Sequence, residues 1–273
     1  MDNNKNPEIL YKYRCWDDDH PYDKRVLTHS EIFFSSPANF NDPFDCRITP
    51  RYDRMSEEDF YRLMEIRLRK AYPNTNDTEV ANYIDQERNR GKHKDEKFFA
   101  EGKKRFEEDT CHEAGICSMT LDPENILMWS HYSNAHTGFC IGFDYKLLDD
   151  FLFEISSGIE LLLDIKKVKY PREYPLLEPK PDESPEIIIN VFINKADDWK
   201  YEKEYRVISI GRINFSIVLN NTIIKSVILG SQMPLSKKNE IIAVLRNRGL
   251  KVELFQAYKK EYGFSLEFER IQY

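Results

Sequence analysis

The stretch Trp199-Lys-Tyr-Glu-Lys-Glu-Tyr-Arg-Val-Ile-Ser-Ile210 contains the alternation of side chains that decides the fold. From Tyr201 onward we predict a strand, because aromatic and β-branched residues favour strands. Glu202, Glu204 and Arg206 would then share one face. Two like charges side by side raise the pKa of one carboxyl group unless a cation or ligand intervenes, and Arg206 could be that cation. The face is either a paired acidic site with one catalytic carboxylate or a solvent-facing ladder of salt bridges.

Further strands precede and follow this stretch along the chain. Apolar runs and alternating patterns predict strands over residues 9–14, 31–35, 114–119, 138–143, 161–170, 215–219, 223–229, 252–258 and 264–271. Helices are predicted over residues 123–132, 186–198 and 236–248, and loops over residues 17–24 and the proline-rich 171–185. Together these elements predict an α+β fold built on a mostly antiparallel or mixed sheet.

Residues 51–110 differ from the rest because they are rich in charges of both signs. Ser56 and Asp59 resemble a capping box, and apolar residues follow at helical spacing, so a first helix is predicted there. Two more helices are predicted, around residues 80–87 and over residues 97–108. We interpret 51–110 as a charged helical insertion within a single domain that spans 1–273. The insertion is either a solvated helical layer or a binding platform.

Composition excludes several classes of function. The net charge of −7 over 273 residues argues against a generic nucleic-acid binder, although a local basic patch stays open. No apolar run approaches the roughly 20 residues of a membrane span, and Met1–Lys5 lack the apolar core of a signal peptide. The ten glycines never take the spacing of a dinucleotide, P-loop or nucleophile-elbow motif. We therefore expect no membrane contact and none of these three common sites.

The cysteines indicate the redox environment. Their number, five, is odd and their spacing is irregular, which favours free thiols in a reducing cytoplasm. Cys111, His112 and Cys117 form a Cys/His cluster that lacks a second pair of ligands, so we expect no zinc site and name no metal ligand.

The segment Tyr11-Lys12-Tyr13-Arg14 is the first candidate site. On a strand, Tyr11 and Tyr13 share one face while Lys12 and Arg14 share the other. Arg14 could bind a carboxylate or phosphate with two parallel hydrogen bonds. The alternative is an exposed basic edge beside two core tyrosines.

The turn-rich segment Phe40-Asn41-Asp42-Pro43-Phe44-Asp45 is the second candidate. Asn41 and Asp42 can form the turn by bonding their own backbone. The turn does not need Asp45, whose carboxylate could pair with Arg14 or Arg206.

The third candidate is Met128-Trp129-Ser130-His131-Tyr132 at the end of a predicted helix. A tyrosine or histidine there can stack on a ring or donate to a ribose or phosphate. A histidine at a helix end can equally be structural. Trp129, His131 and Tyr132 are thus candidate binding residues.

Taken in order, these motifs resemble those of an uncharacterised bacterial family, domain of unknown function 2971. The resemblance rests on residues 11–14, 40–45, 128–132, 138–144 and 199–206 and covers most of the chain outside the helical insertion. The family name itself implies no activity.

A second resemblance, to toxin-like ADP-ribosyltransferases, implies one. These enzymes carry an Arg or His, then a Ser or Tyr, then a Glu-x-Glu on successive strands, and Arg14, Ser35 and Glu202-x-Glu204 occur here in that order. The resemblance implies a split sheet that binds NAD without a glycine-rich loop. Arg14 would hold the pyrophosphate, and Ser35 would order the site. Tyr13 or Tyr132 would stack on nicotinamide. Glu204 would bond the ribose 2′-OH and stabilise the oxocarbenium-like transition state.

The leading hypothesis is an enzyme that cleaves NAD at the nicotinamide–ribose bond, as a toxin or a phage-defence effector. Its ligand is a nucleotide-type small molecule, and a protein or nucleic acid could be its target. The first alternative is a Mg²⁺-assisted phosphodiester-acting enzyme that uses Asp42, Asp45, His131, Glu202 and Glu204. The second is a non-catalytic sensor or interaction domain, with residues 51–110 as the partner surface and both glutamates in solvent.

Overall fold

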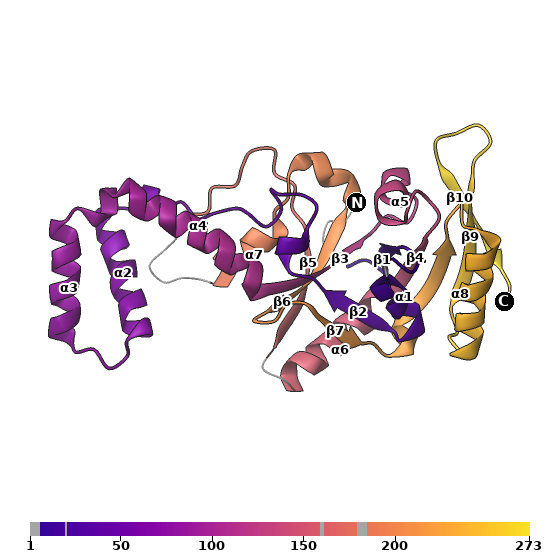
Figure 1. Ribbon diagram of the computed structural model, residues 1–273, viewed down its shortest axis with the longest axis horizontal. Coiled ribbons are helices and arrows are strands. Elements are labelled where there is room, and N and C mark those ends of the chain that lie inside the picture. Colours follow the sequence, from indigo (N-terminus) through magenta and orange to yellow (C-terminus); the bar gives the residue numbers. More distant parts are fainter. Residues whose placement is uncertain (1–5, 20, 159–160, 179–184) are drawn as a thin grey trace. The chain divides into compact units, whose positions relative to one another are not determined.

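The computed structural model describes residues 6–19, 21–158, 161–178 and 185–273 (Figure 1). The predictions for Met1–Lys5, and for 179–184 of the proline-rich loop, lie outside these residues. The contacts divide the chain into two compact units. The first, here called the sheet unit, contains Met1–Asn39, Glu113–Val168 and Asp198–Tyr273. The second, the helical unit, contains Phe40–His112 and Lys169–Asp197. That the whole chain forms a single domain stays a prediction.

An eight-stranded mixed sheet, counted over the described residues, forms the body of the sheet unit. Its strands lie in the order β10-β9-β8-β4-β1-β3-β6-β5. They are β1 Ile9–Arg14, β3 Ala114–Thr120, β4 Phe139–Asp144, β5 Leu162–Lys167, β6 Glu204–Ile210, β8 Ile224–Leu229, β9 Glu253–Lys259 and β10 Leu266–Ile271. A separate pair joins β2 Glu31–Phe34 to β7 Phe215–Val218. The predicted α+β fold with a mostly antiparallel or mixed sheet is confirmed.

The parallel pair in the large sheet is β8 with β9. Parallel neighbours need a long crossover, and α8 Leu235–Asn247 provides it. The other pairs in this sheet are antiparallel. The helix lies beside the two strands it connects (Figure 1).

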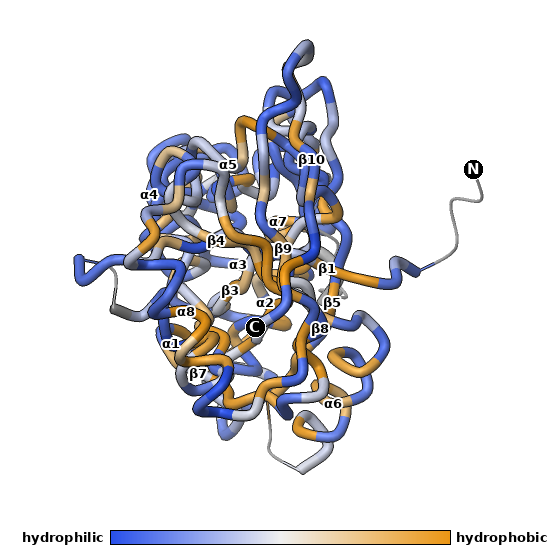
Figure 2. The backbone as a smooth tube through the Cα atoms, turned by 90° about the vertical axis from the view of Figure 1, so that its right-hand side faces the viewer, coloured by the Kyte–Doolittle hydropathy of each residue, from blue (hydrophilic) through white to orange (hydrophobic). Residues whose placement is uncertain are grey.

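Both faces of the sheet are covered by helices of the same unit. One face packs on α1 Pro21–Thr28, α6 Tyr145–Gly158 and α8 through a large apolar cluster. The other face packs on α5 Ile126–Tyr132 through a smaller cluster. The backbone is hydrophobic along much of β8 and β9 and more hydrophilic in the connections around them (Figure 2). A sheet covered on both faces explains why β3 and β4 read as continuous apolar runs.

The centre of the sheet is splayed between β1 and β3. These strands pair at one position, Tyr11 with Thr120. Farther along β3, Ser35 takes the place of β1 as the partner of Ile116. Where the ladder opens, the Lys12 ammonium donates a hydrogen bond to the Ser118 carbonyl. A side chain thus satisfies a backbone group that the missing ladder would leave unpaired.

Charged helices dominate the helical unit. They are α2 Glu57–Ala71, α3 Asp77–Asn89 and α4 Glu96–Glu113, whose last residue belongs to the sheet unit. The unit also contains the helix α7 Pro185–Ile193, whose sequence is mostly apolar. The predicted cap is present, because Ser56 Oγ accepts from the Asp59 amide at 3.0 Å. Phe60, Tyr61, Val80 and Ile84 form a small core between α2 and α3, which run side by side (Figure 1).

Short 3₁₀ segments complete the described secondary structure. They are η1 Pro37–Asn39, η2 Tyr52–Arg54, η3 Lys92–Lys94, η4 Asp197–Glu202 and η5 Asn221–Ile223. Every helix among the described residues is too short or too polar to cross a membrane.

Three helices correct the sequence predictions. α1 begins at Pro21, inside the predicted loop, because proline is well suited to the first turn of a helix. α5 is capped by Asn125 and so starts at Ile126, later than predicted. α6 was not predicted. Its signals are Asp144, whose Oδ1 accepts from the Leu147 amide at 3.0 Å, and a buried stripe that includes Leu148.

Candidate functional site

The face of the sheet that packs on α5 carries a buried ion pair. Cross-strand pairing aligns Ser118 with Arg206 and Thr120 with Glu204, so these four side chains project from one face. Arg206 Nε donates to Glu204 Oε1 at 2.8 Å, and its Nη2 donates to Oε2 at 3.0 Å. Both side chains are almost fully buried, with 0% of Arg206 and 4% of Glu204 exposed. Arg206 thus balances the charge of Glu204, one of the two glutamates for which a neighbouring cation was predicted.

Glu202 takes a different position from the one predicted. It ends the 3₁₀ segment η4 instead of lying on β6, so the prediction that it continues the strand is wrong. Lys203 has a φ of 45°, a left-handed conformation that breaks the alternation of side chains. The Glu202 side chain nevertheless turns toward α5, where Tyr132 donates its hydroxyl proton to Oε1 at 2.7 Å. Only 3% of Glu202 is exposed.

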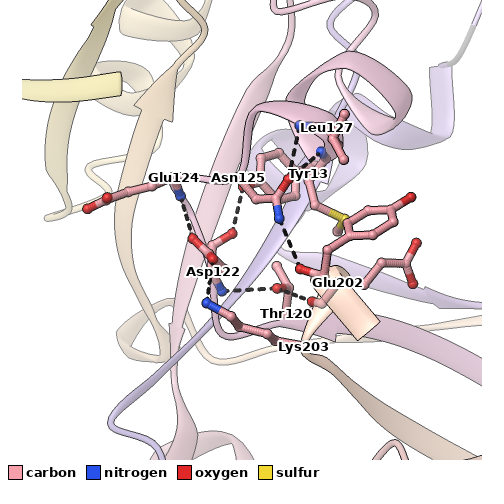
Figure 3. Close-up of polar contacts among 10 residues, drawn as sticks. Tyr13, Thr120, Asp122, Glu124, Asn125, Leu127, Glu202 and Lys203 are labelled. Carbon is pink, nitrogen blue, oxygen red and sulfur yellow. Dashed lines mark hydrogen bonds and ion pairs between the residues drawn. The ribbon is translucent and has the colours of Figure 1, made fainter. Parts of the chain in front are cut away.

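A hydrogen-bond network fixes the turn that carries Glu202 (Figure 3). Thr120 Oγ1 donates to the Glu202 carbonyl at 2.6 Å and accepts from the Asp122 amide at 3.0 Å. Lys203 Nζ lies 2.7 Å from Asp122 Oδ2. These contacts tie the end of β3 to the start of β6. They hold a strained backbone position, and strain of this kind is often found at functional sites.

The helix above the sheet is anchored to the same turn. Asn125 Oδ1 accepts from the Leu127 amide at 2.9 Å and so caps α5. The Asn125 side-chain amide donates to the Tyr201 carbonyl at 3.0 Å. A single asparagine thereby connects the helix that carries Tyr132 to the segment that carries Glu202 (Figure 3).

Two predicted binding residues are part of the core on this face. Trp129 is fully buried, and its Nε1 donates to the Pro123 carbonyl at 2.8 Å. Tyr13 packs edge-on against it with ring centroids 5.1 Å apart and donates to the Asp122 carbonyl at 2.6 Å. Burial raises the pKa of Tyr13. Both side chains support α5 and are closed off from solvent.

Two other predicted binding residues are more accessible. Tyr11 shares the Tyr13 face and is half-buried, and burial raises the pKa of its phenol. His131 is exposed and meets the Tyr132 ring edge-on, with centroids 6.2 Å apart.

Arg14 projects from the opposite face of the sheet. Alternation along β1 places it with Lys12, and the Tyr11–Thr120–Glu204 register puts Tyr11 and Glu204 on the other face. Arg14 Nε lies 3.4 Å from Asp23 Oδ1 at α1. The structure does not bring Arg14 together with Glu204.

Ser35 lies at the far end of β3 from Glu204. It bridges Ile116, whereas Glu204 aligns with Thr120. Ser35 Oγ donates to the Ser36 carbonyl at 3.2 Å. Its side chain is therefore engaged in its own turn.

The second candidate segment belongs to the helical unit. Asp42 Oδ1 accepts from the Phe44 amide at 2.9 Å, which is the predicted turn, and Asn41 is exposed. Asp45 is buried and lies 3.6 Å from Nζ of Lys195, which is also buried. The predicted pairing of Asp45 with an arginine of the sheet unit stays a prediction.

The network also contains four residues that were not predicted to position the site: Thr120, Asp122, Asn125 and Lys203. Asn125 could have been found, because an asparagine directly before an apolar helical run is a capping signal. Thr120 and Asp122 lie close together in the sequence but far from Glu202 and Lys203, so no local pattern signals the network that joins them.

Lys12 was predicted to lie on an exposed basic edge if it had no binding role, and it is buried. Burial lowers the pKa of its ammonium from the ordinary lysine value, and the nearby Arg14 charge lowers it further.

The described residues contain no group of three or more His, Cys, Asp or Glu side chains that could hold a metal ion. The five cysteines, all among the residues that the structure describes, are not joined in disulfides.

Comparison with known proteins bears on one part of the chain. No curated protein and no solved structure matches it. Residues 128–207 match the family model described as "Protein of unknown function (DUF2971)". This segment runs from α5 to β6 and contains both side-chain pairs, Tyr132–Glu202 and Glu204–Arg206. Over residues 128–207, the chain is similar to that uncharacterised family, which supports the predicted resemblance for the motifs at 128–132, 138–144 and 199–206. The predicted motifs at 11–14 and 40–45 lie outside the match.

Proposed function

We propose that the sheet unit binds NAD against its α5-covered face and cleaves the nicotinamide–ribose bond. The observation that carries the proposal is the Tyr132–Glu202 hydrogen bond of 2.7 Å beside the Glu204–Arg206 ion pair. A fixed carboxylate is suited to stabilise the positive charge that develops on the ribose as nicotinamide leaves. The Glu-x-Glu resemblance to ADP-ribosyltransferases supports the same chemistry.

The two glutamates take different roles in this proposal. Both oxygens of Glu204 accept from Arg206, so its charge is balanced inside the sheet. Glu204 and Arg206 therefore act as positioning residues. Glu202 is the catalytic carboxylate, because Tyr132 orients it and the network through Thr120 fixes its backbone. This assignment replaces Glu204 by Glu202 at the ribose 2′-OH.

The reaction balances without a metal or an oxidant. The bond between ribose C1′ and the nicotinamide nitrogen breaks, and its electron pair neutralises the pyridinium. Glu202 accepts a hydrogen bond from the 2′-OH and faces the oxocarbenium charge. Water, or a nucleophile on a protein or nucleic acid, forms the new bond to C1′ and releases its proton to bulk water. The half-buried Tyr11 offers a ring for nicotinamide on the same face.

Such a reaction would deplete NAD or modify a target in the cytoplasm. Either outcome suits a toxin or a phage-defence effector. Opening of the closed site must accompany binding, because Glu202 is only 3% exposed.

Release of nicotinamide from labelled NAD tests the proposal. Glu202→Gln should lower the rate by about 10²–10³-fold, the usual loss when one stabilising group is removed. Tyr132→Phe should lower it about tenfold, since a charged hydrogen bond is lost. Glu124→Gln is the control, because Glu124 is exposed at the turn before α5. Thermal unfolding of each variant separates lost chemistry from lost structure.

Absence of nicotinamide release by the wild type would contradict the proposal, and so would a Glu202→Gln variant as active as Glu124→Gln.

The geometry supports the two alternative functions less well. The metal-assisted hypothesis needs clustered ligands, and the described residues contain no such group. The interaction-domain hypothesis expects Glu202 and Glu204 in solvent, and both are buried.

A further inference from the structure

The helical unit contains a pocket that the proposed function does not use. Its volume is about 360 Å³, within the range of roughly 300–1,000 Å³ typical of small-molecule sites. Aromatic side chains from η2, α2 and α4 form much of its wall; they are Tyr52, Phe60, Phe98, Phe99 and Phe106. An apolar wall with a few polar groups is the usual make-up of a ligand pocket.

Gly102 keeps one wall of this pocket open. It lies in the interior of α4, where glycine is a poor helix former. A Cβ atom built on Gly102 would meet nothing within 4 Å, and its φ is not left-handed. Neither the helix nor a neighbour requires a glycine here. The absent side chain instead leaves room for something that approaches the helix closely.

The two arginines of the pocket are held differently. Arg67 Nη2 donates to the Tyr52 hydroxyl at 2.8 Å, and its guanidinium lies 4.9 Å from the centre of that ring. Arg105 lies one turn after Gly102, and its side chain makes no hydrogen bond or ion pair with the described residues. The Arg105 guanidinium is therefore available to an anion at the mouth of an apolar pocket.

We propose that this pocket binds a small amphipathic monocarboxylate. The apolar body would lie among the phenylalanine rings, and the carboxylate would pair with Arg105. Glu101 and Asp109 also line the pocket, one turn before and after Arg105. Their charges repel a polyanion such as a nucleotide, whereas a single carboxylate can form an ion pair with the Arg105 guanidinium. The pocket thus differs in ligand class from the NAD site and is independent of it.

Titration with octanoate and with octanol, followed by calorimetry on the full chain, tests this proposal. Octanoate should bind saturably and about tenfold more tightly than octanol, because a charged hydrogen bond to Arg105 is added. Arg105→Gln should remove that tenfold difference and leave octanol binding unchanged. Gly102→Phe should fill the pocket and abolish binding of both.

Arg246→Gln, an exposed arginine on α8, is the matched control and should bind like the wild type. Arg105 is exposed as well, so we expect Arg105→Gln to fold like the wild type. No saturable binding of octanoate would overturn the proposal. Equal affinity for octanol, or a Gly102→Phe variant that folds and still binds, would do so too. None of these results depends on nicotinamide release.

Discussion

The sheet unit and the helical unit both contain ion pairs between an arginine and a carboxylate, but one pair is buried and the other is exposed. In the sheet unit, Arg206 Nε lies 2.8 Å from Glu204 Oε1, and both side chains are buried. In the helical unit, Arg69 lies 2.9 Å from Glu65 and 2.8 Å from Asp77, with all three side chains well exposed. The distances match, but water screens the second cluster and not the first. Distance alone therefore says little about what an ion pair contributes.

The largest effect should come from breaking the buried pair. Arg206→Met leaves the Glu204 carboxylate buried without its cation and should lower the free energy of unfolding by about 3–5 kcal/mol. Urea denaturation measures this. The double variant Glu204→Met with Arg206→Met should recover part of the loss, because no buried charge remains. A loss below about 1 kcal/mol in the single variant would place this pair in the same class as the surface pairs.

Replacing Lys12 should change how stability depends on pH. Burial lowers the pKa of Lys12, so the unfolded chain binds this proton more tightly than the folded chain. Stability therefore rises with pH from the lowered folded value up to the ordinary lysine pKa of about 10.4. This contribution is at most about 1.4 kcal/mol per pH unit. Lys12→Met should remove it, as seen by comparing urea unfolding of both proteins from neutral to alkaline pH. Parallel curves would show that the pKa of Lys12 is the same in the folded and the unfolded chain, which would contradict this prediction.

In the helical unit, the cap of α2 should matter more than its surface charges. Ser56 Oγ accepts from the Asp59 amide at 3.0 Å. Ser56→Ala leaves that amide without its side-chain partner and should cost about 1 kcal/mol. Loss of helical circular dichroism signal on heating measures the change. A variant as stable as the wild type would mean that water replaces the cap without cost.

The smallest effect should come from Arg69→Gln. Its partners Glu65 and Asp77 stay hydrated when it is removed, so the loss should be smaller than for Ser56→Ala. Added salt should shrink it further. The same denaturation assay applies, and a larger loss than for Ser56→Ala would contradict the contrast between the two units.

The strands of the sheet were largely predictable, because the apolar runs at β3 and β4 and the alternation at β1 are local patterns. The alternation of Tyr11 with Lys12 gave the correct face for each side chain. The alternation did not tell which residues of other strands lie on each face of the sheet. Arg14 was therefore grouped with Glu204, although the register places them on opposite faces. Strand order is a non-local property, and no short motif encodes it.

The candidate site was predictable in composition and only partly in geometry. Glu202, Glu204, Arg206 and Tyr132 were singled out, and the structure joins them in two pairs. The left-handed Lys203, which takes Glu202 off the strand, could not be foreseen, because a non-glycine residue with positive φ leaves no clear sequence signal. The missed α6 was foreseeable from Asp144 and the apolar spacing after it.

Nicotinamide release by two variants, Arg14→Gln and Glu202→Gln, tests the central claim most directly. The two residues lie on opposite faces of one sheet, and we place the chemistry on the α5-covered face. Arg14→Gln should stay within about twofold of the wild type, whereas Glu202→Gln should fall by about 10²-fold or more. Loss of activity in Arg14→Gln with activity kept in Glu202→Gln would contradict the account and move the site to the other face.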